Sequence, residues 1–94
     1  MKTILLFGAG KSATVLIDYL IDNAAAEKWA IVVVDADLQL AKSKIAGSAY
    51  AKAVSFDITN MDERVQFIRS ADIVISLLPP HLHIEVAKDC VEHQ

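Results

Sequence analysis

Residues 8–13 of this sequence read Gly8-Ala9-Gly10-Lys11-Ser12-Ala13. The run follows residues 3–7, a short apolar segment with the composition of a buried strand. It also opens a segment in which apolar residues from Ala13 to Ala24 recur at helical spacing. A glycine turn between a strand and a helix is the G-x-G-x-x-G/A fingerprint of a dinucleotide-binding fold. The sequence therefore predicts a turn that holds a pyrophosphate.

The residue types in this turn suit a doubly charged phosphate group. Gly8 allows a tight turn, Gly10 lacks a side chain that would block the phosphates, and Ala13 lets the helix pack closely against the strand. Unpaired N–H groups and the positive end of the helix dipole then face the ligand. The predicted cofactor contacts here are Gly8, Ala9, Gly10, Lys11, Ser12 and Ala13.

The remaining chain alternates apolar runs with helix-period segments. Further strands are predicted at residues 30–34, 51–56 and 71–78. Helices are predicted after Asp37 up to a stop at Gly47, from Asn60 through Ile68 with Glu63 completing a capping box, and over residues 82–91. This βαβαβαβα pattern predicts one α/β domain over residues 1–94, a Rossmann-type parallel sheet with strand order 3-2-1-4.

An acidic residue ends the second predicted strand. Asp35 follows Ala13 at the spacing expected for the carboxylate that accepts hydrogen bonds from the adenosine ribose. We assign its neighbour Ala36 to the same contact. A carboxylate repels the 2′-phosphate of NADP and no arginine follows it, so NAD is the favoured cofactor. NADP stays possible, because alanine at the place of Ala13 is often met in NADP-binding turns.

The ends of the third and fourth predicted strands reach the same crevice. Asp57 is placed to accept from the adenine amine, with Ile58 against the ring, although a plain turn-forming aspartate fits the pattern nearly as well. The backbone of Leu77, Leu78 and Pro79 is predicted to line the nicotinamide side, where the sheet order reverses.

Composition excludes several function classes. The net charge is −3, from 12 acidic and 9 basic residues without a block of like charge, which argues against nucleic acid as a partner. No apolar run reaches the roughly 20 residues that cross a membrane. The single cysteine, Cys90, fits a reducing compartment and packs as core, so we expect a cytoplasmic protein. His81 and His83 are too few for a metal site, and none is predicted.

Two other phosphate-binding motifs share parts of the turn. Gly10-Lys11-Ser12 is similar to the end of a P-loop, but Leu5 stands where that motif needs its first glycine. Methyltransferases also combine a glycine turn with an acidic strand end, although they usually carry glycine at the place of Ser12. The methyltransferase alternative remains open on these residues alone.

Three segments carry a resemblance to a known family. They are Leu6-Phe7-Gly8-Ala9-Gly10-Lys11-Ser12-Ala13, Ser55-Phe56-Asp57-Ile58-Thr59-Asn60, and Ile75-Ser76-Leu77-Leu78-Pro79 followed by His83. Together they resemble the saccharopine dehydrogenase/saccharopine reductase family, over essentially the whole chain. The third segment is more particular to that family than the glycine turn.

The resemblance implies an oxidoreductase of lysine metabolism. Such an enzyme uses a nicotinamide cofactor to reduce, or form by reduction, the secondary amine that joins two amino-acid skeletons. Residues 1–94 would then be its NAD(P)-binding domain, while the substrate domain and the catalytic residues would lie beyond Gln94. No catalytic residue is therefore predicted in this chain, an amino-acid substrate is expected for the full enzyme, and a homo-oligomer is expected. Asp35 departs from the basic residue expected in members that use NADP.

A non-enzymatic interpretation competes with this one. NAD-binding regulatory modules of potassium transport also pair a glycine turn with a Val-Asp strand end, an Asp-x-Thr segment and an Ala-Asp-x-Val strand. All these patterns occur here, at Val34-Asp35, at Asp57 and Thr59, and from Ala71 to Val74. Such modules seldom carry a diproline like Pro79-Pro80 after the fourth strand, so they rank second.

The fourth predicted strand lies at an edge of the predicted sheet although it is the most apolar. Asp72 is its only charge, whereas natural edge strands are usually charged, short or covered. We expect a fifth parallel strand beyond Gln94 to cover it.

Overall fold

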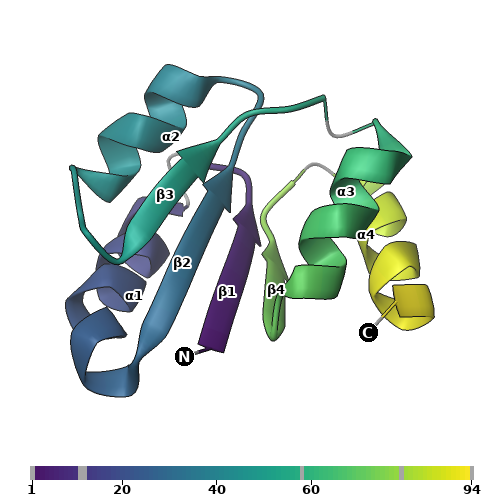
Figure 1. Ribbon diagram of the computed structural model, residues 1–94. Coiled ribbons are helices and arrows are strands. Elements are labelled where there is room, and N and C mark those ends of the chain that lie inside the picture. Colours follow the sequence, from purple (N-terminus) through teal and green to yellow (C-terminus); the bar gives the residue numbers. More distant parts are fainter. Residues whose placement is uncertain (1, 11–12, 58, 79, 94) are drawn as a thin grey trace.

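A computed structural model describes residues 2–10, 13–57, 59–78 and 80–93, with the side chains of residues 84–92 only in the last range. Strands and helices alternate in the order β1 (Lys2–Phe7), α1 (Thr14–Glu27), β2 (Trp29–Val34), α2 (Leu38–Ile45), β3 (Ala51–Val54), α3 (Met61–Ser70), β4 (Ile73–Ser76) and α4 (Pro80–His93). The described strands form one sheet in the order β3-β2-β1-β4, with every neighbouring pair parallel (Figure 1). The predicted fold class and strand order are confirmed.

The differences from the predicted elements lie at strand ends. β3 stops before the predicted residues 55–56, where the Ser55 hydroxyl donates at 3.0 Å to the Ala36 carbonyl in the loop after β2. β4 begins after the predicted residue 71, because the Asp72 carboxylate accepts the Thr3 N–H at 2.7 Å in place of a backbone carbonyl. β4 also ends at Ser76, before the predicted residues 77–78.

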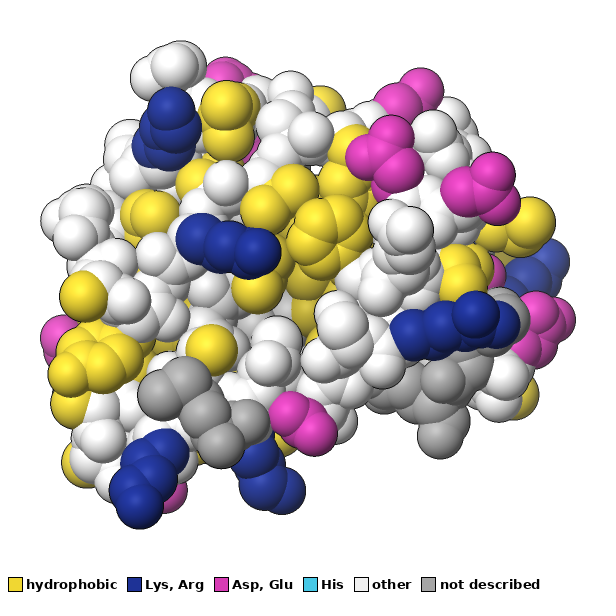
Figure 2. Space-filling model, viewed as in Figure 1, with side chains coloured by type: hydrophobic (Ala, Val, Ile, Leu, Met, Phe, Trp, Pro, Cys, Tyr) yellow, Lys and Arg dark blue, Asp and Glu magenta, His cyan; other side chains and the backbone are white. Residues whose placement is uncertain are grey.

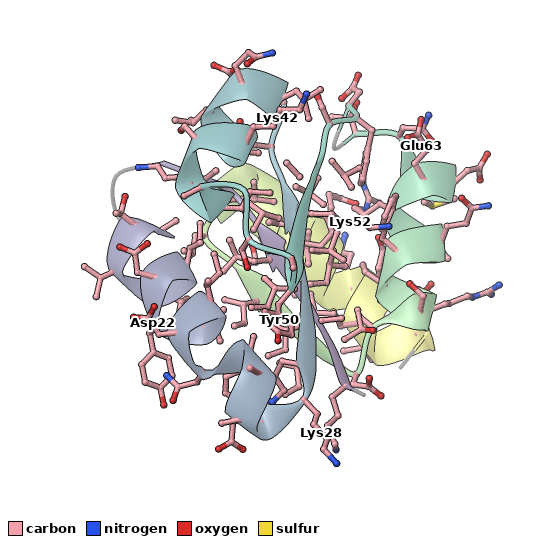
Figure 3. All side chains as sticks on the ribbon, turned by 60° about the vertical axis from the view of Figure 1, so that its left-hand side comes forward. Asp22, Lys28, Lys42, Tyr50, Lys52 and Glu63 are labelled. Carbon is pink, nitrogen blue, oxygen red and sulfur yellow. The ribbon has the colours of Figure 1, made fainter. Side chains whose placement is uncertain are left out.

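Helices cover both faces of the sheet, which explains the apolar strands. Ile4 and Leu6 of β1 belong to a core cluster with α1 and α2, whereas Leu5 and Phe7 face a second cluster with α3 and α4. These four side chains are at most 2% exposed. Each contributes roughly 1.5–3 kcal/mol by leaving water. Figure 3 shows α1 and α2 on one side of the strands and α3 on the other.

The predicted cap residues begin two helices, but the capping box at α3 differs from its prediction: the Asn60 N–H donates to the Asp57 carbonyl and not to the Glu63 side chain. Asp37 accepts the Leu40 N–H at 3.1 Å and begins α2. Asn60 accepts the Glu63 N–H at 3.2 Å and begins α3, and its side-chain amide donates to the Glu63 carboxylate. α2 ends in left-handed residues, with Ala46 taking this conformation just before the predicted stop at Gly47.

The β4 side of the molecule carries exposed apolar side chains. Ile73 and Leu77 are 45% and 38% exposed, and on α4 Ile84 and Val91 are 53% and 86% exposed. Among the described residues β4 has a strand neighbour on one side only, as the predicted order requires. The view in Figure 2 shows further apolar surface between β3 and α3, where Tyr50, Lys52 and Phe67 help to line a cavity of about 410 Å³.

A buried ion pair joins α3 to α4. Arg64 and Asp89 are 3% and 5% exposed, and the Arg64 Nε donates to the Asp89 carboxylate. Glu85, half exposed, lies 3.9 Å from the same guanidinium. Arg64 and Ile68 are the buried residues of α3, while Val65 is only partly buried. A charged side chain can be buried there because its counter-charge comes from the facing helix.

Breaking this pair should destabilise the fold strongly. Asp89→Ala leaves a buried guanidinium without its carboxylate, and we expect a loss of about 3 kcal/mol or more in the free energy of unfolding. Glu85→Gln, which removes only the exposed partner, should cost less than about 1 kcal/mol. Urea denaturation measures the free energy of unfolding of both variants. Equally small decreases in the two variants would mean that the Arg64–Asp89 pair contributes little to stability.

Candidate functional site

The candidate site lies where the four parallel strands end. In the register of the sheet Phe7 pairs with Val34 and with Ser76, and Val34 pairs with Val54. The segments that follow these residues therefore leave the sheet along one edge, at the top of Figure 1. Open α/β sheets bind ligands at this edge.

The glycine turn begins in a conformation that requires glycine. Gly8 has φ +98° and its N–H donates to the Val34 carbonyl at 2.8 Å. A Cβ at this position would lie 3.2 Å from the Leu77 carbonyl oxygen, so the turn runs directly against the end of β4. The positive φ and the nearby Leu77 carbonyl thus both require glycine at position 8, in agreement with the predicted tight turn.

Gly10 has a different environment. It is exposed, and a Cβ built there would meet nothing within 4 Å. The Ala13 N–H closes the turn on the Gly10 carbonyl at 2.9 Å, and Ala13 itself is fully buried in the core beside α1. The described residues therefore supply no steric reason for glycine at position 10. Lys11 and Ser12, predicted in this turn, lie outside the described residues.

Among the described residues no side chain caps the start of α1. Ala13 occupies the cap position and has no oxygen to offer, whereas α2 and α3 are capped by Asp37 and Asn60. The first turn of α1 also contains no acidic residue. The backbone N–H groups of this turn, with the positive end of the helix dipole, are therefore suited to an anion.

The Asp35 carboxylate accepts hydrogen bonds from two backbone N–H groups, one in the glycine turn and one at the start of α2. Its Oδ2 accepts the Ala9 N–H at 2.7 Å and its Oδ1 accepts the Asp37 N–H at 2.9 Å. The carboxylate predicted to bind a ribose is thus brought to the glycine turn, as its position after β2 suggested. Ala36 beside it is exposed, and its carbonyl accepts the Ser55 hydroxyl. Sequence reasoning did not find this role of Ser55.

Asp57 forms the turn after β3. Its carboxylate accepts the Thr59 hydroxyl at 2.6 Å and the Thr59 N–H at 2.9 Å, and its carbonyl accepts the Asn60 N–H. The hydrogen bond from the Thr59 hydroxyl lowers the pKa of Asp57 most, and the bond from the Thr59 N–H lowers it further. Asp57 therefore forms a turn in the structure, which was one of its two predicted roles, while its contact with adenine stays a prediction. Ile58 lies outside the described residues.

The end of β4 forms the wall on the other side of the glycine turn. The Leu77 N–H donates to the Phe7 carbonyl at 2.9 Å, and its side chain is partly exposed. Leu78 packs against the second core cluster, and the buried Ser76 hydroxyl has no hydrogen-bond partner within the described part of the chain. Pro79 lies outside the described residues, as do the side chains of His81 and His83.

Other candidate groups stay away from this edge. Cys90 is half-buried against the second core cluster, where burial and the neighbouring Asp89 raise the pKa of its thiol. In the described residues no three His, Cys, Asp or Glu side chains gather as metal ligands would. None of the described helices combines the length and apolar character that a membrane span needs.

Known proteins match this chain over nearly its full length. The family model of the saccharopine dehydrogenase NADP binding domain matches residues 4–94. The alpha-aminoadipic semialdehyde synthase of Arabidopsis thaliana is 26% identical over 95% of this chain and 10% of its own length. The solved saccharopine dehydrogenase (L-Glu forming) of Saccharomyces cerevisiae is 30% identical, with a TM-score of 0.86 over 99% of this chain and 20% of that chain.

A more distant solved structure agrees in fold alone. ChuY, an anaerobillin reductase of Escherichia coli O157:H7, is 22% identical, with a TM-score of 0.65 over 98% of this chain and 46% of its own. The chain thus spans a tenth of the matched synthase and a fifth of the matched dehydrogenase. These similarities confirm the family resemblance and favour the oxidoreductase interpretation over the potassium-transport module.

Gly8 and Gly10 should respond differently to the same substitution. Gly8→Ala forces a side chain into a left-handed conformation against the Leu77 carbonyl, and we expect a loss of about 1–3 kcal/mol in the free energy of unfolding. Gly10→Ala meets open space and should leave stability within about 0.5 kcal/mol. Thermal and urea unfolding compare the stability of the two variants. Equal losses of stability would contradict the conclusion that only position 8 requires glycine for the fold.

The Asp57 turn predicts a small pH dependence. Because the folded-state pKa of Asp57 is lowered, the bonds from Thr59 stabilise the fold above the unfolded-state pKa and are lost as pH falls through the folded-state value. Thr59→Ala should therefore raise the pKa of Asp57 toward that of an ordinary aspartate, whereas Thr59→Ser keeps the hydroxyl. Carboxyl chemical shifts below about pH 5 follow this, and an unchanged pKa in Thr59→Ala would refute the cause given.

Proposed function

Because this chain belongs to the family of saccharopine dehydrogenase NADP-binding domains, we propose that residues 8–13 hold the pyrophosphate of a nicotinamide dinucleotide. The open space at Gly10 carries the proposal. A phosphate has to approach the backbone closely at the second glycine of such a turn, and this chain leaves that space free. The uncapped first turn of α1 supplies the donors and the favourable dipole.

The adenosine half would lie across the ends of β2 and β3. Asp35 would accept the ribose hydroxyls beside Ala36, while Asp57 and Ile58 would face the adenine edge. The Asp35 carboxylate favours NAD over NADP, since it would repel a 2′-phosphate. The family model is named for NADP, so the cofactor preference of this chain rests on Asp35 and is open to a direct test.

The nicotinamide half would lie against the end of β4. The partly exposed Leu77, with the backbone of Leu78 and Pro79, would form the wall beside the reacting ring. The cofactor supplies hydride transfer when bound. What this chain contributes is the orientation of the dinucleotide, and we assign it no catalytic residue.

For the whole protein we propose an oxidoreductase that acts on a secondary amine joining two amino-acid skeletons. The support is the family match over residues 4–94, together with the matched dehydrogenase and synthase. An amino-acid substrate, a homo-oligomeric assembly and a cytoplasmic location belong to the same proposal. Cys90, the only cysteine in the sequence, is consistent with a reducing compartment.

Calorimetric titration with NAD and with NADP tests the proposal. We expect NAD to bind the chain about fivefold or more tightly than NADP, since a like charge at about 4 Å costs about 1 kcal/mol or more. Gly10→Ala should keep the fold and lose most of the affinity for both, because its Cβ enters the phosphate space. Undiminished binding by that variant would overturn the phosphate site, and tighter binding of NADP would overturn the preference for NAD.

A further inference from the structure

The Asp35 carboxylate is already occupied by the chain's own backbone. One of its oxygens accepts the Ala9 N–H at 2.7 Å and the other accepts the Asp37 N–H at 2.9 Å. Ala9 lies inside the glycine turn and is fully buried, while Asp37 begins α2. A single side chain thus ties the glycine turn to the start of the next helix.

The Ala9 N–H needs an acceptor because it is buried. The neighbouring positions of the turn are held by backbone bonds, from the Gly8 N–H to Val34 and from the Ala13 N–H to Gly10. For Ala9 the acceptor is a side chain that lies 26 residues further along the chain. A buried N–H that loses its partner is costly, so the turn would shift to find water or another acceptor.

We infer that Asp35 is a positioning residue for the phosphate turn, in addition to its contact with the ribose. This inference rests on the proposed function, because it concerns how that turn is held ready for a dinucleotide. A carboxylate has about four acceptor sites, so two remain for ribose hydroxyls while the bonds to Ala9 and Asp37 persist. One residue thereby couples phosphate binding to ribose recognition.

The two roles of Asp35 predict opposite effects on NADP. If Asp35 acted on the ribose alone, removing its charge would weaken NAD and strengthen NADP, since the repulsion of the 2′-phosphate disappears. If it also positions the turn, removing the acceptor costs affinity for both dinucleotides in addition to this charge effect, so a variant without charge and acceptor binds both more weakly than a variant without the charge alone. Asp35→Ala removes charge and acceptor together, whereas Asp35→Asn removes the charge and keeps one oxygen that can accept from Ala9.

The test combines amide hydrogen exchange at Ala9, without any ligand, with calorimetry of NAD and NADP on the full chain. In Asp35→Ala we expect the Ala9 amide to exchange about tenfold faster or more than in the unaltered chain. We expect both dinucleotides to bind this variant about tenfold more weakly than they bind Asp35→Asn, which has lost the same charge, as the loss of a hydrogen bond implies. In Asp35→Asn the Ala9 amide should stay protected and NADP should bind at least as tightly as in the unaltered chain.

Asp37→Asn is the matched control. It removes one negative charge two residues away, asparagine caps a helix as well as aspartate does, and the Asp37 N–H that donates to Asp35 is unchanged. Its Ala9 amide should behave as in the unaltered chain. The control therefore separates the loss of an acceptor from a general change of charge.

The outcomes distinguish this inference from the proposed function. Binding of both dinucleotides by Asp35→Ala as tightly as by Asp35→Asn, or an Ala9 amide in Asp35→Ala that exchanges as slowly as in the unaltered chain, would overturn the positioning role while leaving the cofactor site intact. If the unaltered chain binds neither dinucleotide, the proposed function fails, and positioning for a dinucleotide fails with it whatever the Ala9 amide shows. If Asp35→Ala does not fold, an unprotected Ala9 amide in Asp35→Asn overturns the inference and a protected one supports it.

Discussion

The pairing of β1 with a parallel strand on each side is the constraint on which the rest of the structure depends. Phe7 pairs with Val34 in one direction and with Ser76 in the other. Three chain segments that are far apart in the sequence are therefore brought to one level, where each leaves the sheet. The left-handed start of the glycine turn, the carboxylate after β2 and the backbone wall after β4 meet only because these strands end together.

Much of the fold follows from local patterns in the sequence. Apolar runs of strand length, alternating with helix-period segments, are enough to predict the parallel order, because a sheet covered on both faces demands such runs. The roles of Asp37 and Asn60 as caps also follow from residue type and spacing. The position of Asp35 beside the turn was predictable for the same reason, since it depends on strand pairing alone.

Interactions between elements that are not paired strands were harder to predict. Arg64 and Asp89 are buried because α3 packs on α4. Which face of each helix meets the other depends on this packing and is not evident from the sequence of either helix alone. A signal was present, since Arg64 lies four residues before Ile68 and Asp89 three after Val86, on buried stripes. The bonds of Asp35 to Ala9 and of Ser55 to Ala36 carry no such signal, because each depends on how two loops turn after their strands.

The contact between Gly8 and Leu77 has a consequence for the order in which the protein can be assembled. β1 is the first strand of the chain and β4, its neighbour in the sheet, is the last of those described. During synthesis on a ribosome, β1, α1 and β2 can emerge and pair early, but the wall against which the glycine turn rests does not yet exist. The hydrogen bonds that hold the glycine turn can form once β2 and Asp35 have been made, whereas the wall beside Gly8 is complete only when the chain has reached Leu77.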